Sequence, residues 1–126
     1  MTDNEYAEKG RAVQQQLWGE RVSAGTPAAP FVNIAPDYAG LVRESCFGMF
    51  WARPGLAVRD RSLITVALLA ALGRHDELRG HLAGALNVGL SKEELVEALM
   101  HVGVYAGVPA AVSALNTAAS VLGSAG

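Results

Sequence analysis

Three glycines divide the second half of the chain into segments of helical length, and this division constrains the fold more than any other feature. Gly73, Gly89 and Gly107 each follow a segment whose apolar residues recur at helical spacing. Glycine often follows the last turn of a helix, because it adopts a left-handed backbone conformation without strain. The segments between these glycines therefore predict consecutive helices with short connections, which pack as neighbours and are in several cases antiparallel.

The whole pattern predicts six helices. Their approximate bounds are residues 2–20, 37–51, 57–72, 76–88, 91–106 and 109–122. Thr2 with Glu5, and Ser91 with Glu94, have the spacing of a capping box. No segment shows the alternation of polar and β-branched residues that is typical of a strand. We therefore expect an all-α fold of one compact domain over residues 1–126.

The spacing of apolar residues also predicts which side chains are buried. In residues 37–51 the predicted inward side chains are Tyr38, Leu41, Val42, Cys46 and Met49 or Phe50. In residues 76–88 they are Leu78, Leu82, Ala85 and Leu86, and in residues 91–106 they are Leu95, Leu99 and Val102. Residues 57–72 are apolar nearly all round, so we expect this helix to be central. Residues 23–36 contain Gly25 and three prolines, which predicts an extended connection with Phe31 and Ile34 packed onto the core.

Charge is sparse in this chain, which limits the partners it can have. Charged residues make up 17% of the sequence, apolar residues 51%, and the formal net charge is -2. Nucleic acid is a poor fit, because phosphate binding needs clustered lysine and arginine. A surface with so little charge is typical of a subunit whose apolar excess is covered by other subunits.

The chain also lacks the sequence signals of a membrane or secreted protein. The longest apolar run, residues 63–72, is about half of the roughly 20 residues that span a bilayer. The first ten residues are acidic and polar, unlike a secretory signal. Cys46 is the single cysteine and cannot form an internal disulfide, so we expect a cytoplasmic protein.

Glu77 and His81 are the strongest candidates for chemistry. They are four residues apart in a predicted helix, so their side chains lie on one face. A carboxylate beside an imidazole can act as a proton-transfer pair near neutral pH. The same spacing is also common in surface ion pairs, so both interpretations stand at this point.

Two further groups of residues could form part of a binding site. Glu97, His101 and Tyr105 recur at intervals of four and form a polar stripe on an otherwise apolar helix. Helix pairing could bring His101 and Tyr105 towards His81, or both could lie at the rim of the core. Trp51 and Arg53 precede a rigid Pro-Gly turn, where an arginine could hold a carboxylate or cap the preceding helix.

Several familiar chemistries are disfavoured by missing motifs. Cys46 has no partner in a CxxC motif, so dithiol chemistry lacks its second sulfur. The three histidines do not have the spacing of a zinc site, and there is no glycine-rich phosphate loop. The sequence therefore leaves acid–base chemistry without a metal or cofactor, or a binding function.

Four segments in order resemble the carboxymuconolactone decarboxylase family. They are FGMFWARPGL, RDRSLITVALLAALGR, DELRGHLAGALNVG and HVGVYAGVPAA, and the resemblance extends from Tyr6 to Leu122. It implies a compact subunit with the alkylhydroperoxidase D-like fold, assembled as a homotrimer or homohexamer. It also implies a cofactor-independent lyase of aromatic degradation, which removes carbon dioxide from a carboxylated muconolactone to give an enol-lactone. The peroxidase branch of this family has a CxxC followed by histidine, and here only His81 matches that pattern.

The resemblance also assigns roles to individual residues. It implies that His81 is the general acid–base, that Glu77 orients it or shares its proton, and that Arg53 contacts an anion. The other residues expected to bind the substrate are Trp51, Met49, Asn87, His101 and Tyr105.

Three positions depart from the family pattern. Met49 stands where the decarboxylases usually have an acid, Ala83 replaces an arginine, and Val88 replaces an asparagine. These changes make the expected site more apolar and remove partners for substrate carboxylates, which are costly to bury unpaired. We therefore expect a less charged substrate, derived from an aromatic compound or a polyketide. The alternatives are 4-carboxymuconolactone itself, or a catalytically silent homologue that serves in binding or assembly.

Overall fold

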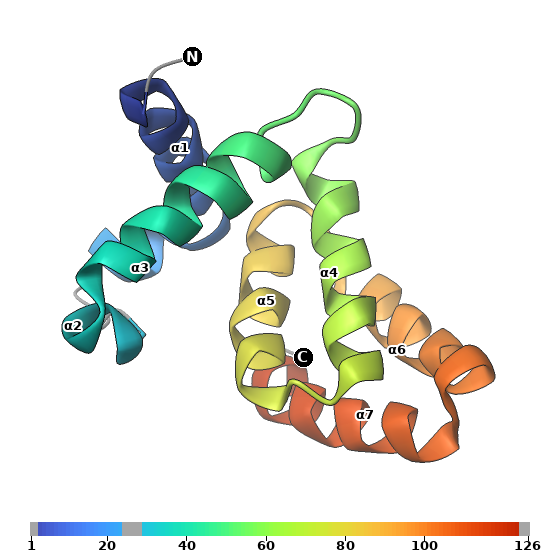
Figure 1. Ribbon diagram of the computed structural model, residues 1–126. Coiled ribbons are helices and arrows are strands. Elements are labelled where there is room, and N and C mark those ends of the chain that lie inside the picture. The colour runs from blue at the N-terminus through green and yellow to red at the C-terminus, as the bar shows by residue number, and fades with distance from the viewer. Residues whose placement is uncertain (1–2, 24–28, 124–126) are drawn as a thin grey trace. The chain divides into compact units, whose positions relative to one another are not determined.

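The computed structural model describes residues 3–23 and 29–123, and nearly all of these residues are helical (Figure 1). The elements are α1 (Asp3–Ser23), α2 (Phe31–Ile34), α3 (Pro36–Val42), the π-helix η1 (Arg43–Trp51), α4 (Val58–Leu72), α5 (His75–Asn87), α6 (Lys92–Ala106) and α7 (Val108–Leu122). These residues contain no strand, so the predicted all-α class is confirmed. The predicted Thr2 cap lies outside the described residues.

The chain divides into two compact units, Met1–Val58 and Arg59–Gly126. Each unit is described by itself below. The single domain expected over residues 1–126 stays a prediction. No helix in the described part of the chain has both the length and the apolar character needed to cross a bilayer.

In the unit Met1–Val58, α1 packs closely against η1. Two glycines allow this approach. A Cβ atom added at Gly10 would overlap the carbonyl oxygen of Arg43, and one added at Gly48 would overlap the carbonyl oxygen of Tyr6. The Arg43 Nε also donates a 2.8 Å hydrogen bond to Gln14 Oε1 on α1. The backbones of the two helices therefore meet at glycine, and larger residues flank the contact.

The helix predicted over residues 37–51 has a different buried face from the expected one. Phe47, Gly48 and Trp51 are buried, and the ring of Phe47 contacts both Trp18, edge to face at 5.7 Å, and Trp51 at 5.6 Å. The predicted inward residues Tyr38, Leu41, Cys46, Met49 and Phe50 are exposed within this structure. For Cys46, Met49 and Phe50 the expected pattern assumed α-helical spacing, whereas residues 43–51 form a π-helix with a wider repeat, which changes the face that meets α1. Tyr38 and Leu41 lie in α3, which buries none of its residues.

The expected extended connection over residues 23–36 is also wrong in its described part. Residues 31–34 form the short helix α2, and Pro36 begins α3. Ile34 is 87% exposed and Phe31 is exposed as well, so neither is packed onto the core of its unit. Residues 24–28 lie outside the description.

In the unit Arg59–Gly126, helices α4 to α7 surround one apolar core, with α4 and α5 side by side in Figure 1. Residues Gly73, Gly89 and Gly107 have φ values of +73°, +103° and +104°, which confirms that each predicted helix end needs a conformation that favours glycine. The predicted buried faces of α5 and α6 are confirmed for Leu78, Leu82, Ala85, Leu95, Leu99 and Val102.

Two details of this unit bear on the sequence analysis. The capping box is present: Glu94 N donates to Ser91 Oγ at 3.0 Å, and Ser91 N donates to Glu94 Oε1 at 2.9 Å. Helix α4 is not the fully buried central helix that was expected. It buries Ser62, Val66 and Ala70, whereas Ile64, Leu68 and Leu72 are exposed. An all-round apolar helix can also be one whose outer face is covered by another molecule.

Candidate functional site

Glu77 and His81 lie on α5, one helical turn apart, as the sequence predicts. Glu77 is in the first turn and is exposed, whereas the Nδ1 atom of His81 is buried. The two side chains are close enough to interact electrostatically. An exposed carboxylate and a partly buried imidazole on one face can exchange or stabilise a proton, whereas a surface ion pair would leave both groups in water.

Burial controls the protonation state of His81. Removal of the ring from water lowers its pKa from 6.5 to about 4, and the negative charge of Glu77 opposes this shift. At neutral pH the ring is therefore neutral in nearly all molecules, and one of its nitrogens can accept a proton. Glu77 then stabilises the imidazolium that forms when a proton arrives.

His101 and Tyr105 lie together on α6, with ring centroids 5.5 Å apart. Both line an open apolar groove between α4 and α6, whose other wall includes Ile64 and Leu68. The groove lining comes from α4 and α6 and does not include His81, which is on α5. Within this unit the structure therefore does not bring His101 and Tyr105 into one groove with His81, and their role in substrate binding stays a prediction.

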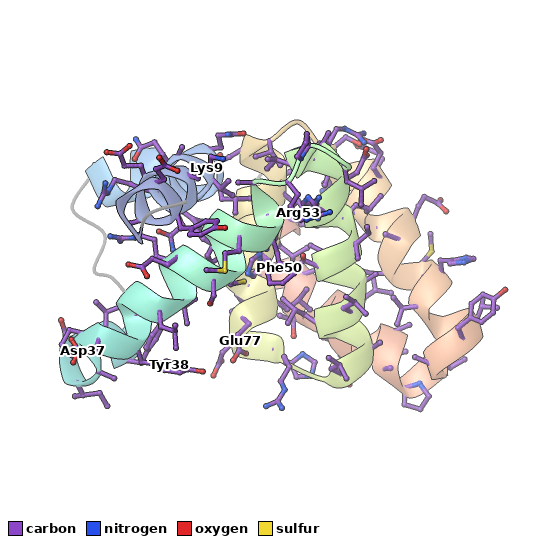
Figure 2. All side chains as sticks on the ribbon, turned by 45° about the horizontal axis from the view of Figure 1, so that its top comes forward. Lys9, Asp37, Tyr38, Phe50, Arg53 and Glu77 are labelled. Carbon is purple, nitrogen blue, oxygen red and sulfur yellow. The ribbon has the colours of Figure 1, made fainter. Side chains whose placement is uncertain are left out.

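Three of the predicted site residues, Met49, Trp51 and Arg53, belong to the unit Met1–Val58. Trp51 is 8% exposed and packs against Phe47, so its ring already has a role in the core of that unit. Met49 lies on η1 and is exposed, and Arg53 follows η1 with an exposed side chain. Figure 2 labels Arg53 and Phe50. Asn87, the last residue of α5, is exposed. The assignment of these four residues to a substrate site stays a prediction.

The structure also shows two polar residues of α4 and α5 that the sequence analysis did not single out. His75 Nδ1 is 2.9 Å from Thr117 Oγ1, and the Thr117 hydroxyl donates to the carbonyl of Ser113 at 3.1 Å. The single hydroxyl proton of Thr117 can serve either Ser113 or His75, so the donor in the Thr117–His75 contact follows from the tautomer of His75. Ser62 is fully buried, and its hydroxyl makes no hydrogen bond to any described residue. Serine and histidine at helix ends are too common for either feature to be predicted from sequence.

The described residues contain no group of three or more His, Cys, Asp or Glu side chains that could hold a metal ion. Cys46 is the free thiol of the chain, and partial burial raises its pKa, which disfavours the reactive thiolate. The chemistry that these residues support best is proton transfer at His81.

These features define an all-α protein with a partly buried, neutral histidine on one of its helices. Comparison with known proteins identifies the family of this chain. The sequence profile of the carboxymuconolactone decarboxylase family matches residues 36–120. The chain belongs to this family.

Two relatives named as decarboxylases and one uncharacterised relative share at least 30% identity with the chain. It is 36% identical over 121 residues to a 4-carboxymuconolactone decarboxylase of Acinetobacter baylyi, covering 96% of this chain and 90% of the relative. It is 36% identical over 88 residues to a nitrosuccinic acid decarboxylase of Metarhizium robertsii, covering 70% of this chain and 59% of the relative. An uncharacterised 15.0 kDa protein of Paracoccus denitrificans is 30% identical over 91 residues, which is 71% of this chain and 68% of the relative.

Proposed function

We propose that this protein is a decarboxylase, a carbon–carbon lyase that uses His81 for proton transfer and needs no cofactor. The observation that carries the proposal is the partly buried imidazole of His81, whose Nδ1 atom is shielded from water and whose pKa is lowered to about 4 by desolvation, one turn after Glu77 on α5. Two of the relatives are named as decarboxylases, although of different acids. Relatives that share decarboxylation but differ in substrate are consistent with a common proton-transfer residue and a substrate site that varies.

In the proposed reaction, His81 first accepts the proton of a substrate carboxylic acid. The carbon–carbon bond to that carboxylate then breaks, carbon dioxide leaves, and the bonding electron pair passes into a conjugated carbonyl as an enolate. The imidazolium of His81 returns the proton to carbon, which regenerates the neutral ring. A histidine pKa of about 4 is close to that of an ordinary carboxylic acid, so proton transfer between the two is nearly balanced in energy.

Glu77 and Arg53 have supporting roles in this proposal. The Glu77 carboxylate raises the pKa of His81 and so favours the imidazolium that exists only during the reaction. Arg53, which follows η1, would contact a carboxylate or carbonyl oxygen of the substrate, and its guanidinium is suited to bidentate binding. Trp51, Met49, Asn87, His101 and Tyr105 are the further residues that we propose for substrate binding.

The substrate that we propose carries less charge than carboxymuconolactone and derives from an aromatic compound or a polyketide. Ala83 and Val88, both partly buried on or next to α5, stand where the resembled pattern has an arginine and an asparagine. A second substrate carboxylate would have no cation at position 83, and an unpaired buried ion costs several kcal/mol, on the order of a hundredfold or more in binding.

A second candidate is 4-carboxymuconolactone itself. The observation that favours it is the 36% identity to the Acinetobacter baylyi enzyme over 90% of that protein. The two candidates share the chemistry of His81 and differ in how many substrate carboxylates the site must bind.

Release of carbon dioxide from a panel of acids tests these proposals. The panel contains 4-carboxymuconolactone and monocarboxylic aromatic and polyketide-like acids, each assayed with the wild type, Ala83→Arg and the control Ala119→Arg on an exposed position of α7. We expect turnover of a monocarboxylic acid by the wild type, and a shift towards the charged lactone in Ala83→Arg alone. Efficient turnover of 4-carboxymuconolactone by the wild type would establish the second candidate. No turnover of any acid would indicate a silent homologue.

We further propose that the protein acts as a homotrimer or homohexamer in the cytoplasm. The sparse charge of the chain and the exposed apolar side chains of α4 support an assembly of several copies.

A further inference from the structure

Helix α5 carries both Glu77 and His81, but its first turn has little support of its own. The N-cap position is Arg74, and among the described residues no side chain forms a cap hydrogen bond there. Asp76 bonds to Arg79 at 3.0 Å, a contact that lies entirely within α5. A helix end without a cap frays readily, because its first N–H groups have no partner within the helix. The position of Glu77, which is exposed in this turn, therefore depends on what else holds the turn in place.

A hydrogen bond to α7 holds this turn. His75 is the first residue of α5, and its Nδ1 atom is 2.9 Å from the Oγ1 atom of Thr117 on α7, a helix that packs against α5 (Figure 1). Leu78, three residues further along, lies on the same side of the helix and is fully buried in the core. The first turn is therefore attached at two points, one apolar and one polar, and two attachments restrict its rotation more than one does.

The Thr117 hydroxyl is a suitable anchor for the turn. Thr117 is 7% exposed, and its Oγ1 atom also lies 3.1 Å from the Ser113 carbonyl oxygen within α7. A buried hydroxyl without partners is costly, which favours keeping the contact with His75. The contact also persists in every charge state of the ring, because Nδ1 accepts a proton from the hydroxyl in one neutral tautomer and donates in the other tautomer and in the imidazolium. It can therefore hold the turn throughout the pH range in which His81 titrates.

We propose that His75 and Thr117 are positioning residues, which take the place of a cap on α5 and keep the Glu77 carboxylate one turn from the His81 ring. Neither residue has to touch the substrate in this role. The proposal rests on the functions proposed for Glu77 and His81, and it adds a contact between α5 and α7 on which their interaction depends. If the first turn frays, the carboxylate moves away from the ring, and the imidazolium loses the negative charge that favours it.

Thr117→Val tests the proposal, because valine has nearly the same shape and no hydroxyl. We expect hydrogen exchange of the Leu78 amide, which donates to the Arg74 carbonyl at 2.9 Å, to become about five- to tenfold faster, as the loss of one hydrogen bond implies. Exchange of the Leu82 amide, one turn further along α5, should change much less. NMR titration should show a pKa of His81 below the wild-type value. Thr117→Ser keeps the hydroxyl and should restore both measurements.

Three further proteins separate this role from a general loss of stability. Thr65→Val is the matched control, because the Thr65 hydroxyl donates to the Arg61 carbonyl at 2.8 Å within its own helix α4, and it should change neither measurement. In a Glu77→Gln background, Thr117→Val should cause no further shift of the His81 pKa, because no carboxylate is left to displace. His75→Leu removes the hydrogen bond from its other side and should speed Leu78 exchange as Thr117→Val does. Only exchange is compared for this variant, because the substitution also removes a titratable ring.

The positioning role would be overturned by an unchanged His81 pKa in Thr117→Val, or by the same further shift in the Glu77→Gln background. A lower melting temperature of Thr117→Val with unchanged exchange at Leu78 relative to Leu82 would also overturn it, as would a Thr117→Ser protein that exchanges as fast as Thr117→Val. If Thr117→Val does not fold, exchange in His75→Leu decides the matter. None of these measurements involves turnover, so the assay of carbon dioxide release decides the decarboxylase proposal separately.

Discussion

At the scale of single residues, His81 is subject to two opposing influences, and their balance decides its chemistry. Burial removes water from the imidazolium and lowers the pKa to about 4, whereas the nearby Glu77 carboxylate raises it. The spacing of the two residues was predictable from sequence, because it depends only on α5 being helical. The partial burial of His81 and the exposure of Glu77 could not be predicted, because they depend on how α5 packs.

Glu77→Gln should lower the pKa of His81 further. The substitution removes the charge that favours the imidazolium and keeps the size of the side chain. Titration of the His81 ring by NMR should show the change. Asp76→Asn is the control, since Asp76 is in the same turn and bonds to Arg79 at 3.0 Å. An equal shift in both variants would mean that Glu77 has no specific effect on His81.

Stability should depend on pH through the same residue. The pKa of His81 is about 4 in the folded protein and near 6.5 when the chain is unfolded, so between these values the unfolded state binds more protons. The contribution of His81 is therefore complete above about pH 6.5 and is lost as the pH falls towards 4. Urea unfolding at pH 7 and pH 4.5 should show a smaller loss for His81→Gln than for the wild type. Equal losses would contradict a buried neutral ring.

At the scale of elements, the ends of helices α4 to α6 could be predicted from sequence, whereas the π-helical conformation of η1 could not. Gly73, Gly89 and Ser91 each have a local conformation or hydrogen bond that few residues provide, so their positions predict helix ends directly. The π-helix η1 has no comparable local signal. Its buried face is selected by the approach of α1 at Gly10 and Gly48, which are distant in sequence.

Gly48→Ala should therefore destabilise the packing of α1 on η1. Its Cβ atom would overlap the Tyr6 carbonyl, a backbone atom that moves only if the helices separate, and overpacking of this kind costs about 1–3 kcal/mol. Gly40→Ala on α3 is the matched control, because no atom lies within 4 Å of the added Cβ atom. That change should be neutral or stabilising by up to about 1 kcal/mol. Equal unfolding free energies for both variants in urea would contradict the close contact.

Ser91→Ala should weaken the start of α6 by about 1 kcal/mol, because the Ser91 hydroxyl accepts the Glu94 N–H. Ser91→Asp keeps an acceptor at the cap and should retain most of the stability. Thermal unfolding of the three proteins measures the difference. If Ser91→Asp loses as much stability as Ser91→Ala, the cap bond is not responsible.

At the scale of the whole molecule, the sequence predicted the family and the all-α class, because four motifs recur in order over most of the chain. It misplaced α4, whose outer side chains Leu68 and Leu72 are apolar and exposed. A sequence shows that a helix is apolar all round, but not whether its own chain or another copy covers it. The substrate could not be predicted either, because positions 49, 83 and 88 show which partners are missing and not what replaces them.

The central claim is that a partly buried, neutral His81 transfers the proton in a decarboxylation. Its most direct test is the rate of carbon dioxide release by the wild type and His81→Gln between pH 3.5 and 8, with the best acid from the substrate panel. The proposed transfer needs a neutral His81 and a substrate carboxylic acid that still carries its proton, and both pKa values are near 4. We therefore predict a wild-type rate that rises as the pH falls from 8 towards about 4, together with a loss of roughly 10²–10⁴-fold in His81→Gln. Unchanged turnover in His81→Gln, or a wild-type rate that stays level or falls between pH 8 and pH 4, would contradict the claim.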